Sequence, residues 1–210
     1  MTIRLNGSTS GYTEIDAPAV AGSNTLVLPT GAGSAYQVVR NGATAGSLEF
    51  TDKIVSGTAV ASTSGTSIDF TGLPSWVKRV TVMFSGVSLA TFNSESNSIL
   101  VRLGSSGGVE TSSYTQSSSF VGINSGVYFR SDGFHIATWS VAANTVQGAL
   151  TFVNLSGNTW SCSGAFNHTA GYTVTTAGVK TLSGTLDRVR ITTVNGTDTF
   201  DAGSINLLWE

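Results

Sequence analysis

Few groups in this sequence have the chemistry for catalysis or metal binding. It holds one cysteine, Cys162, and two histidines, His135 and His168. The histidines fall on different expected strands, and neither has a cysteine or carboxylate at a metal-ligand spacing, so we predict no metal site. Cys162 cannot form an intrachain disulfide. Because it alternates with Trp160 and Phe166 in a strand-like run, it is interpreted as a small inward-facing apolar residue rather than a reactive thiol.

Two further motifs have spacings found in hydrolases. The GSSGG segment at 104–108 fits the G-x-S-x-G nucleophile elbow, but that elbow joins a strand to a helix, and a Ser-rich and Gly-rich stretch follows here. A structural turn is therefore the preferred interpretation. Glycosidases need two acids held about 5–9.5 Å apart. The acidic residues here are dispersed along the chain, and the closest pair of aspartates, Asp198 and Asp201, flanks an expected turn. We predict no enzymatic activity, no catalytic residues and no cofactor.

Loops at the strand ends are the expected place for binding. The long ones span residues 91–98 (TFNSESNS) and 104–119, and a shorter one spans 167–172 (NHTAGY). Sugars offer C–H faces to aromatic rings and hydroxyls to amides and carboxylates, so such residues should gather at a glycan site. The alternative is that these loops are simply solvated. The candidate residues for binding a host surface glycan are Asn93, Glu95, Tyr114, Asn167, His168 and Tyr172.

The composition indicates β-structure with many turns. Only 10% of the residues are charged, while 40% are hydrophobic and 25 are glycine. Helical surfaces are usually rich in charge and poor in glycine, so helices are disfavoured. A net charge of −2 gives no electrostatic reason to bind nucleic acid or an anionic membrane. No apolar run approaches the roughly 18 residues that span a bilayer, and the N-terminus lacks a signal-like segment, so we expect cytoplasmic synthesis and no membrane insertion.

Residues 53–210 are predicted to form a β-sandwich head. Short period-2 runs recur there between Gly, Ser, Asn and Asp turns; Val80, Val82 and Phe84, for example, alternate with Thr81 and Met83. A further strand is expected at 179–186. Eight or more strands without a convincing helix fit an all-β, jelly-roll-like antiparallel sandwich. The tryptophans expected in its core are Trp76, Trp139, Trp160 and Trp209.

Residues 1–52 are predicted to form an extended arm that has no core of its own. Pro29 and the glycines at 31–33 exclude a helix from the segment 26–50, which nevertheless carries regularly spaced apolar residues. Such an arm is stable when it pairs with other copies or lies on a larger body. A disordered tail is the alternative. The residues expected to serve anchoring and oligomerisation are Leu26, Leu28, Val38, Val39, Leu48 and Phe50.

Both parts show a resemblance to one class of proteins. The stretch TLVLPTGAGSAYQVVRNGATAGSLEF at 25–50 resembles shaft-type segments of tailed-bacteriophage fibre proteins, with an L-P-x-G-x-G turn, then QVVRNG and a final L-x-F. Residues 56–69, LPSWVKRVTVMF at 73–84 and FDAGSINLLWE at 200–210 resemble small β-domains that end phage structural proteins. The resemblance implies a virion surface protein, a homotrimer with an N-terminal anchoring arm. Long fibres repeat the shaft unit, and its single occurrence here favours a short fibre, a spike or a capsid decoration protein.

Two functional hypotheses follow, and both place the chain on a virion assembled in the host cytoplasm. In the first, a short trimeric tail fibre or spike contacts other virion proteins through residues 1–52 and presents a host-binding head. In the second, a capsid decoration or cement protein, or a head fibre, stabilises the particle without binding a receptor. The likeness of the arm to fibre shafts favours the first, by analogy.

Overall fold

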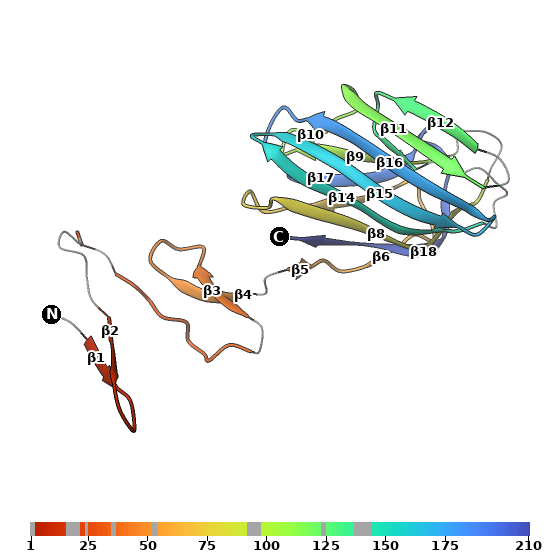
Figure 1. Ribbon diagram of the computed structural model, residues 1–210. Coiled ribbons are helices and arrows are strands. Elements are labelled where there is room, and N and C mark those ends of the chain that lie inside the picture. The colour runs from red at the N-terminus through yellow and green to blue at the C-terminus, as the bar shows by residue number, and fades with distance from the viewer. Residues whose placement is uncertain are drawn as a thin grey trace. The chain divides into compact units, whose positions relative to one another are not determined.

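The chain folds into strands and turns (Figure 1). The computed structural model describes residues 3–15, 22–23, 25–34, 37–51, 54–91, 98–122, 125–136 and 144–210, and within these ranges it contains no helix. The paired strands run antiparallel, so the all-β prediction is confirmed. The chain divides into two compact units, Met1–Lys53 and Ile54–Glu210, called unit 1 and unit 2 below.

The larger sheet of unit 2 has nine strands. They are β5 (Val55–Ser56), β6 (Val60–Ala61), β8 (Arg79–Leu89), β11 (Tyr114–Val121), β12 (Ser125–Arg130), β14 (Val146–Ser156), β15 (Thr159–His168), β16 (Tyr172–Thr181) and β18 (Phe200–Trp209). Their order across the sheet is β12-β11-β16-β15-β14-β8-β18-β5, and β6 also pairs with β18.

The smaller sheet has five strands. They are β7 (Ser67–Thr71), β9 (Ile99–Ser105), β10 (Gly108–Val109), β13 (Phe134–Ile136) and β17 (Arg188–Thr193). The order is β10-β9-β17-β7, and β13 pairs with the N-terminal half of β9.

Apolar side chains from both sheets form one core in unit 2. Strand residues alternate between the two faces of a sheet, and the inward positions here are the apolar ones. Leu150 and Phe152 of the larger sheet are fully buried, as are Val101 and Ile191 of the smaller one. Burying a large apolar side chain contributes about 1.5–3 kcal/mol, so this sandwich-like packing is the main source of stability in unit 2.

A close approach of backbones requires glycine in β18. The register between β18 and β8 shifts on both sides of Ala202, as in a β-bulge. Gly203 sits there with φ +91°, and a Cβ on it would lie 2.4 Å from the carbonyl oxygen of Gly86. A larger residue at position 203 would therefore meet backbone atoms and an unfavourable left-handed conformation.

The structure differs from the sequence-based expectation in three places of unit 2. Strand β11 runs through the Ser-rich stretch that was expected to be a loop. The alternation did not reveal this strand, because its inward positions include Gln116 and Ser118, where apolar residues are usual. The strand expected at 179–186 instead ends at Thr181 and begins at residue 172. Trp160 is buried as predicted, but Trp76 is 42% exposed; Trp139 lies outside the described residues.

Unit 1 consists of two hairpins. Strands β1 (Ile3–Asn6) and β2 (Tyr12–Ile15) form one, and β3 (Val38–Asn41) and β4 (Leu48–Thr51) form the other. Val27 bridges to the second hairpin through backbone hydrogen bonds of 2.8 Å with Gly46 and Leu48. The ring of Phe50 lies against Gly33, where a Cβ would come within 2.8 Å of it. Residues 38–51 thus fold back on themselves rather than remaining extended.

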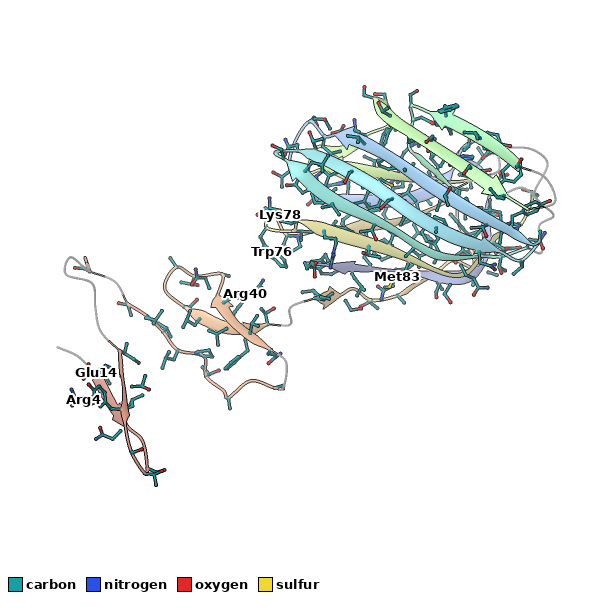
Figure 2. The ribbon with its side chains drawn as sticks, in the orientation of Figure 1. Arg4, Glu14, Arg40, Trp76, Lys78 and Met83 are labelled. Carbon is teal, nitrogen blue, oxygen red and sulfur yellow. The ribbon has the colours of Figure 1, made fainter. Side chains whose placement is uncertain are left out.

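The described residues of unit 1 lack a buried core. From Ile3 to Thr51 every described residue is exposed or partly exposed. Of the six predicted anchoring residues, Leu26, Leu28 and Val39 are 64%, 69% and 50% exposed. Val38, Leu48 and Phe50 are partly exposed, and Val39 pairs with Phe50 across the hairpin. Ion pairs join the strands of each hairpin, Arg4 with Glu14 and Arg40 with Glu49; Figure 2 shows Arg4 and Glu14 together on the first.

The inward and outward positions of β14 give a direct test of the sandwich. Phe152→Ala, at a fully buried site, should lower the free energy of unfolding by about 3–5 kcal/mol because it leaves a cavity. Val153→Ala, at the neighbouring outward position that is 41% exposed, should change it by about 0.5 kcal/mol or less. Urea denaturation of both variants measures the difference, and equal losses would contradict the assigned faces.

Candidate functional site

The strand register defines two ends of unit 2. At one end Val55, next to the connection with unit 1, pairs with Trp209 near the C-terminus, and Thr159 pairs with Thr181. This is called the junction end. At the opposite end, the far end, His168 pairs with Tyr172, Val121 with Ser125 and Leu89 with Phe200. The far end therefore gathers the loops that lie farthest along the strands from the connection to unit 1.

The structure brings together three of the six predicted glycan-binding residues. Asn167, His168 and Tyr172 lie at the far end, around the β15–β16 turn. Tyr114 pairs with Lys180 at the junction end, eight residues along β16 from Tyr172, a separation of about 26 Å along the strand. Asn93 and Glu95 lie outside the described residues.

Tyr114 serves the fold, which corrects its assignment to a surface site. The side chain is only 3% exposed, and its hydroxyl accepts a hydrogen bond from the Leu103 amide at 2.9 Å and donates to the Glu110 carbonyl at 2.9 Å. Its ring meets that of Phe134 edge to face. Burial raises the pKa of the phenol well above its usual value. A ring enclosed in this way cannot stack on an external sugar.

Of the three residues gathered at the far end, Asn167 is the most accessible. His168 is 2% exposed, its Nδ1 accepts a hydrogen bond from the Ala170 amide at 3.3 Å, and burial lowers the pKa of its imidazole. Tyr172 is half-buried with its ring edge-on to Phe120. Asn167 pairs with Thr173 on the outward face, whereas Tyr172 pairs with His168 on the inward face. The exposed Asn167 amide can therefore hydrogen-bond a sugar at the outer surface, and the buried imidazole positions the turn.

A polar network orders the neighbouring turn at the far end. The Asp198 carboxylate accepts hydrogen bonds from the Thr91 hydroxyl at 3.0 Å and from the Asn195 amide at 2.8 Å. The Asn195 carbonyl oxygen in turn accepts from the Thr197 amide at 3.0 Å. Asp201 accepts a hydrogen bond from Ser88 instead. The Asp198 carboxylate thus holds this turn together, and the Asp201 carboxylate bonds to strand β8. The turn also places Thr91, Asn195 and Thr197 at the far end, polar residues that sequence reasoning did not select.

The structure gives structural roles to the other motifs. The GSSGG segment is a hairpin in which Ser105 of β9 pairs with Gly108 of β10, so a strand follows where a nucleophile elbow needs a helix. Cys162 is buried and free, and burial raises its thiol pKa. Within the described ranges, no group of three histidine, cysteine or acidic residues is placed to hold a metal ion.

Two hollows lie at the junction end, built from segments far apart in the sequence. The larger, of about 270 Å³, lies between Trp209, Leu208 and an Arg79–Glu210 ion pair and is called the Trp209 groove below. Ile54, Thr81 and Thr151 also line it, and the hydroxyls of the two threonines are 3.3 Å apart. The smaller, of about 100 Å³, is polar and is lined by residues that include Ser75, Lys78, Asn154, Asn158 and Trp160; Figure 2 shows Lys78 and Trp76 at this end.

The outward face of the larger sheet is almost free of charge. From β12 across to β14, its outward positions hold Ser, Thr, Ala, Val, Asn, Gln, Leu and Phe. Hydroxyl pairs cross it, with Ser119 and Thr175 2.8 Å apart and Thr159 and Thr181 2.9 Å apart. Short side chains lose little conformational entropy when a partner covers them, so this face is suited to contact with a neutral surface.

His135 occupies a buried polar pocket between β13 and the β11–β12 hairpin. It is fully buried, its Nδ1 is 2.8 Å from the Ser118 hydroxyl, and its ring meets that of Tyr128 edge to face. Its Nε2 and both polar side-chain atoms of Gln116 have no hydrogen-bond partner among the described residues. Burial, with a further contribution from Arg130, lowers the pKa of His135 to about 4, while Asp132 acts in the opposite direction. The imidazole is therefore neutral at pH 7.

Comparison of the chain with protein-family models, with curated proteins and with solved structures found no match. In the described part of the chain, no helix has the length and apolar character that a membrane span requires.

Removing the Tyr114 hydroxyl should destabilise unit 2. Tyr114→Phe leaves the Leu103 amide and the Glu110 carbonyl without this partner, which should lower the free energy of unfolding by about 1–3 kcal/mol. Tyr172→Phe, at the half-buried far-end tyrosine, should change it by about 0.5 kcal/mol or less. Denaturant titration of the two variants measures these values. A Tyr114→Phe chain as stable as the parent would show that the hydroxyl is not needed in the core.

Mild acid should weaken the fold through His135. Because its folded pKa, about 4, lies below its ordinary value of 6.5, the unfolded chain binds the proton first. The stabilising contribution is complete above pH 6.5 and is lost as the pH falls toward 4, by about 2 kcal/mol at pH 4.5. Unfolding titrations at pH 7 and 4.5 measure this loss. His135→Gln should remove most of it, and an unchanged loss in that variant would assign the effect to other groups.

Proposed function

We propose that the chain is a structural protein of a bacteriophage virion, a short trimeric tail fibre or spike. Unit 1 is the anchoring arm that contacts other virion proteins. Unit 2 is the host-binding head, which carries out recognition rather than catalysis.

The observation that carries this proposal is the contrast between the two units. Unit 2 has a large buried core, whereas the described part of unit 1 exposes apolar side chains that include Ile3, Leu5, Ile15, Leu26 and Leu28, each more than half exposed. Two small hairpins without a core are marginally stable alone in water. Their exposed apolar residues gain stability when they are covered by a larger assembly, as an anchoring arm is.

The strand pairings support a jelly-roll head. In a jelly roll, a long hairpin of eight strands is rolled up, so that the first strand pairs with the last, the second with the seventh, and so on inward. Here β7 pairs with β17, β8 with β14, β9 with β13, and β11 with β12. These pairs are nested in sequence. The seventh position holds the three-stranded meander β14-β15-β16, and β18 extends the sheet beyond β8.

The positions of the two ends suit a fibre head. Strand β5, which follows the connection to unit 1, pairs with the C-terminal part of β18 at the junction end, and the far end is the opposite end of unit 2. The proposed receptor site lies there. It centres on Asn167, which is exposed, and on Tyr172, which keeps part of its surface accessible at the same turn. The predicted residues Asn93 and Glu95 lie outside the described part of the chain and stay candidates. A surface glycan is the ligand whose chemistry fits these amide, carboxylate and phenol groups.

The alternative is a capsid decoration or cement protein, or a head fibre. The broad, nearly uncharged face of the larger sheet favours it, because such a face can lie on neighbouring capsid subunits without leaving charges uncompensated. In that case the far end would have no receptor-binding role.

The location of the chain on intact particles separates the two functions. Gold-labelled antibody against the chain should mark the tail in electron micrographs, and excess purified chain should slow adsorption of the phage to its host. Asn167→Lys should abolish this competition, whereas Ser163→Lys, an exposed position on the same strand, should preserve it. Label on the capsid without competition would establish the alternative, and unlabelled particles would refute both.

A further inference from the structure

The β11–β12 hairpin carries an exposed apolar patch at the edge of the larger sheet. Phe129, Val121 and Val127 are 78%, 64% and 60% exposed. Strand β12 is the terminal strand on this side, as the upper part of unit 2 in Figure 1 shows. An edge strand is usually protected by lysine, proline or a covering segment, because its backbone and apolar side chains invite pairing with another chain. The outward positions of β12 are Ser125, Val127 and Phe129, which provide no such protection.

The Trp209 groove lies at the opposite edge of the same face. Leu208 and Trp209 give it apolar surface, Thr81 and Thr151 give it two hydroxyls, and Arg79 forms an ion pair with Glu210 beside it. Its volume of about 270 Å³ is below the roughly 300–1,000 Å³ typical of small-molecule sites. It therefore suits one aromatic side chain better than an oligosaccharide.

Phe129 cannot reach the groove of its own chain. The register places both in a single transverse row that runs through Phe129, Ser117, Ala177, Ser163, Thr151, Thr81 and Leu208. Six inter-strand steps separate Phe129 from Leu208, a distance of about 29 Å. An insertion of this phenylalanine into such a groove must therefore join two copies.

The charges favour a second copy as the occupant. The side chains of the row between the patch and the groove are uncharged, and the Arg79 guanidinium is neutralised by Glu210. A second copy that presents Phe129 thus brings no uncompensated charge into the groove. A cation beside a ring adds an attraction of about 0.5–2 kcal/mol, which Arg79 can supply to the inserted phenyl group.

We propose that Phe129 of one copy inserts into the Trp209 groove of the next copy, and that this contact holds the heads together. The inference rests on the proposed homotrimer. Because the patch and the groove are different surfaces, the contact is head-to-tail, and three such contacts close a ring when each turns by one third of a revolution.

The test is photo-crosslinking in the full-length assembly. A benzophenone amino acid at position 129 keeps an aromatic group there, and irradiation should give covalent dimers in which residue 129 is joined to residues 79–81 or 205–210 of another chain. The matched control carries the same group at Ala165, an exposed outward residue in the middle of the sheet that lines neither the patch nor the groove, and should give no such product. The single native cysteine is buried and does not contribute intermolecular links.

A solution measurement separates failure of the contact from failure of the trimer. Light scattering should give three times 21.6 kDa, and Phe129→Asp should raise the concentration at which the assembly half-dissociates by about tenfold or more. Ala165→Asp, at an exposed outward position away from both surfaces, should leave it unchanged. A trimer that resists Phe129→Asp and lacks the crosslink would overturn this contact alone. A monomer would overturn the trimer and the contact together, and an open polymer with the crosslink would support the contact while rejecting the closed ring.

Discussion

The apolar contact between the inward faces of the two sheets is the constraint on which unit 2 depends. Each strand sends alternate residues into this contact, so the remaining residues must face outward. Burial of Leu150 and Phe152 on β14 thus places Thr151 and Val153 on the surface. The same alternation on β8, β11, β15 and β16 produces the broad face of short polar and apolar side chains. The outer surface of unit 2 is a direct consequence of how its core is filled.

The nested strand pairing then separates the surfaces in space. The chain passes repeatedly from one sheet to the other, so loops that are distant in sequence come to lie at the same end of unit 2. The β15–β16 turn and the turn at 194–199 both lie at the far end in this way, although some 25 residues separate them in sequence. The two edges of the larger sheet also differ from each other: one carries an exposed phenylalanine on β12, and the other has a groove beside β18. The proposed anchoring, recognition and lateral contact thus fall on different parts of the chain.

Unit 1, in contrast, does not depend on a buried core in its described residues. Its hairpins satisfy backbone hydrogen bonds locally and pair Arg4 with Glu14 and Arg40 with Glu49 across the strands. Exposed ion pairs of this kind add at most about 1 kcal/mol each, and the hairpins bury no apolar side chain among their described residues. Stability in this unit is therefore expected to come from whatever covers it, which is a property suited to an arm.

The sequence by itself determined the all-β class and most strands of unit 2, because a period-2 alternation is visible wherever apolar residues fill the inward positions. It did not reveal β11, whose inward positions include Gln116 and Ser118. The alternation also does not predict that the side chains of Tyr114 and His168 are buried, because neighbouring strands and turns determine what covers a residue. Only the tertiary structure assembled the Trp209 groove, whose residues come from four separate segments with no local signal. Local periodicity records which way a side chain points along its own strand, whereas a binding surface depends on which strands become neighbours.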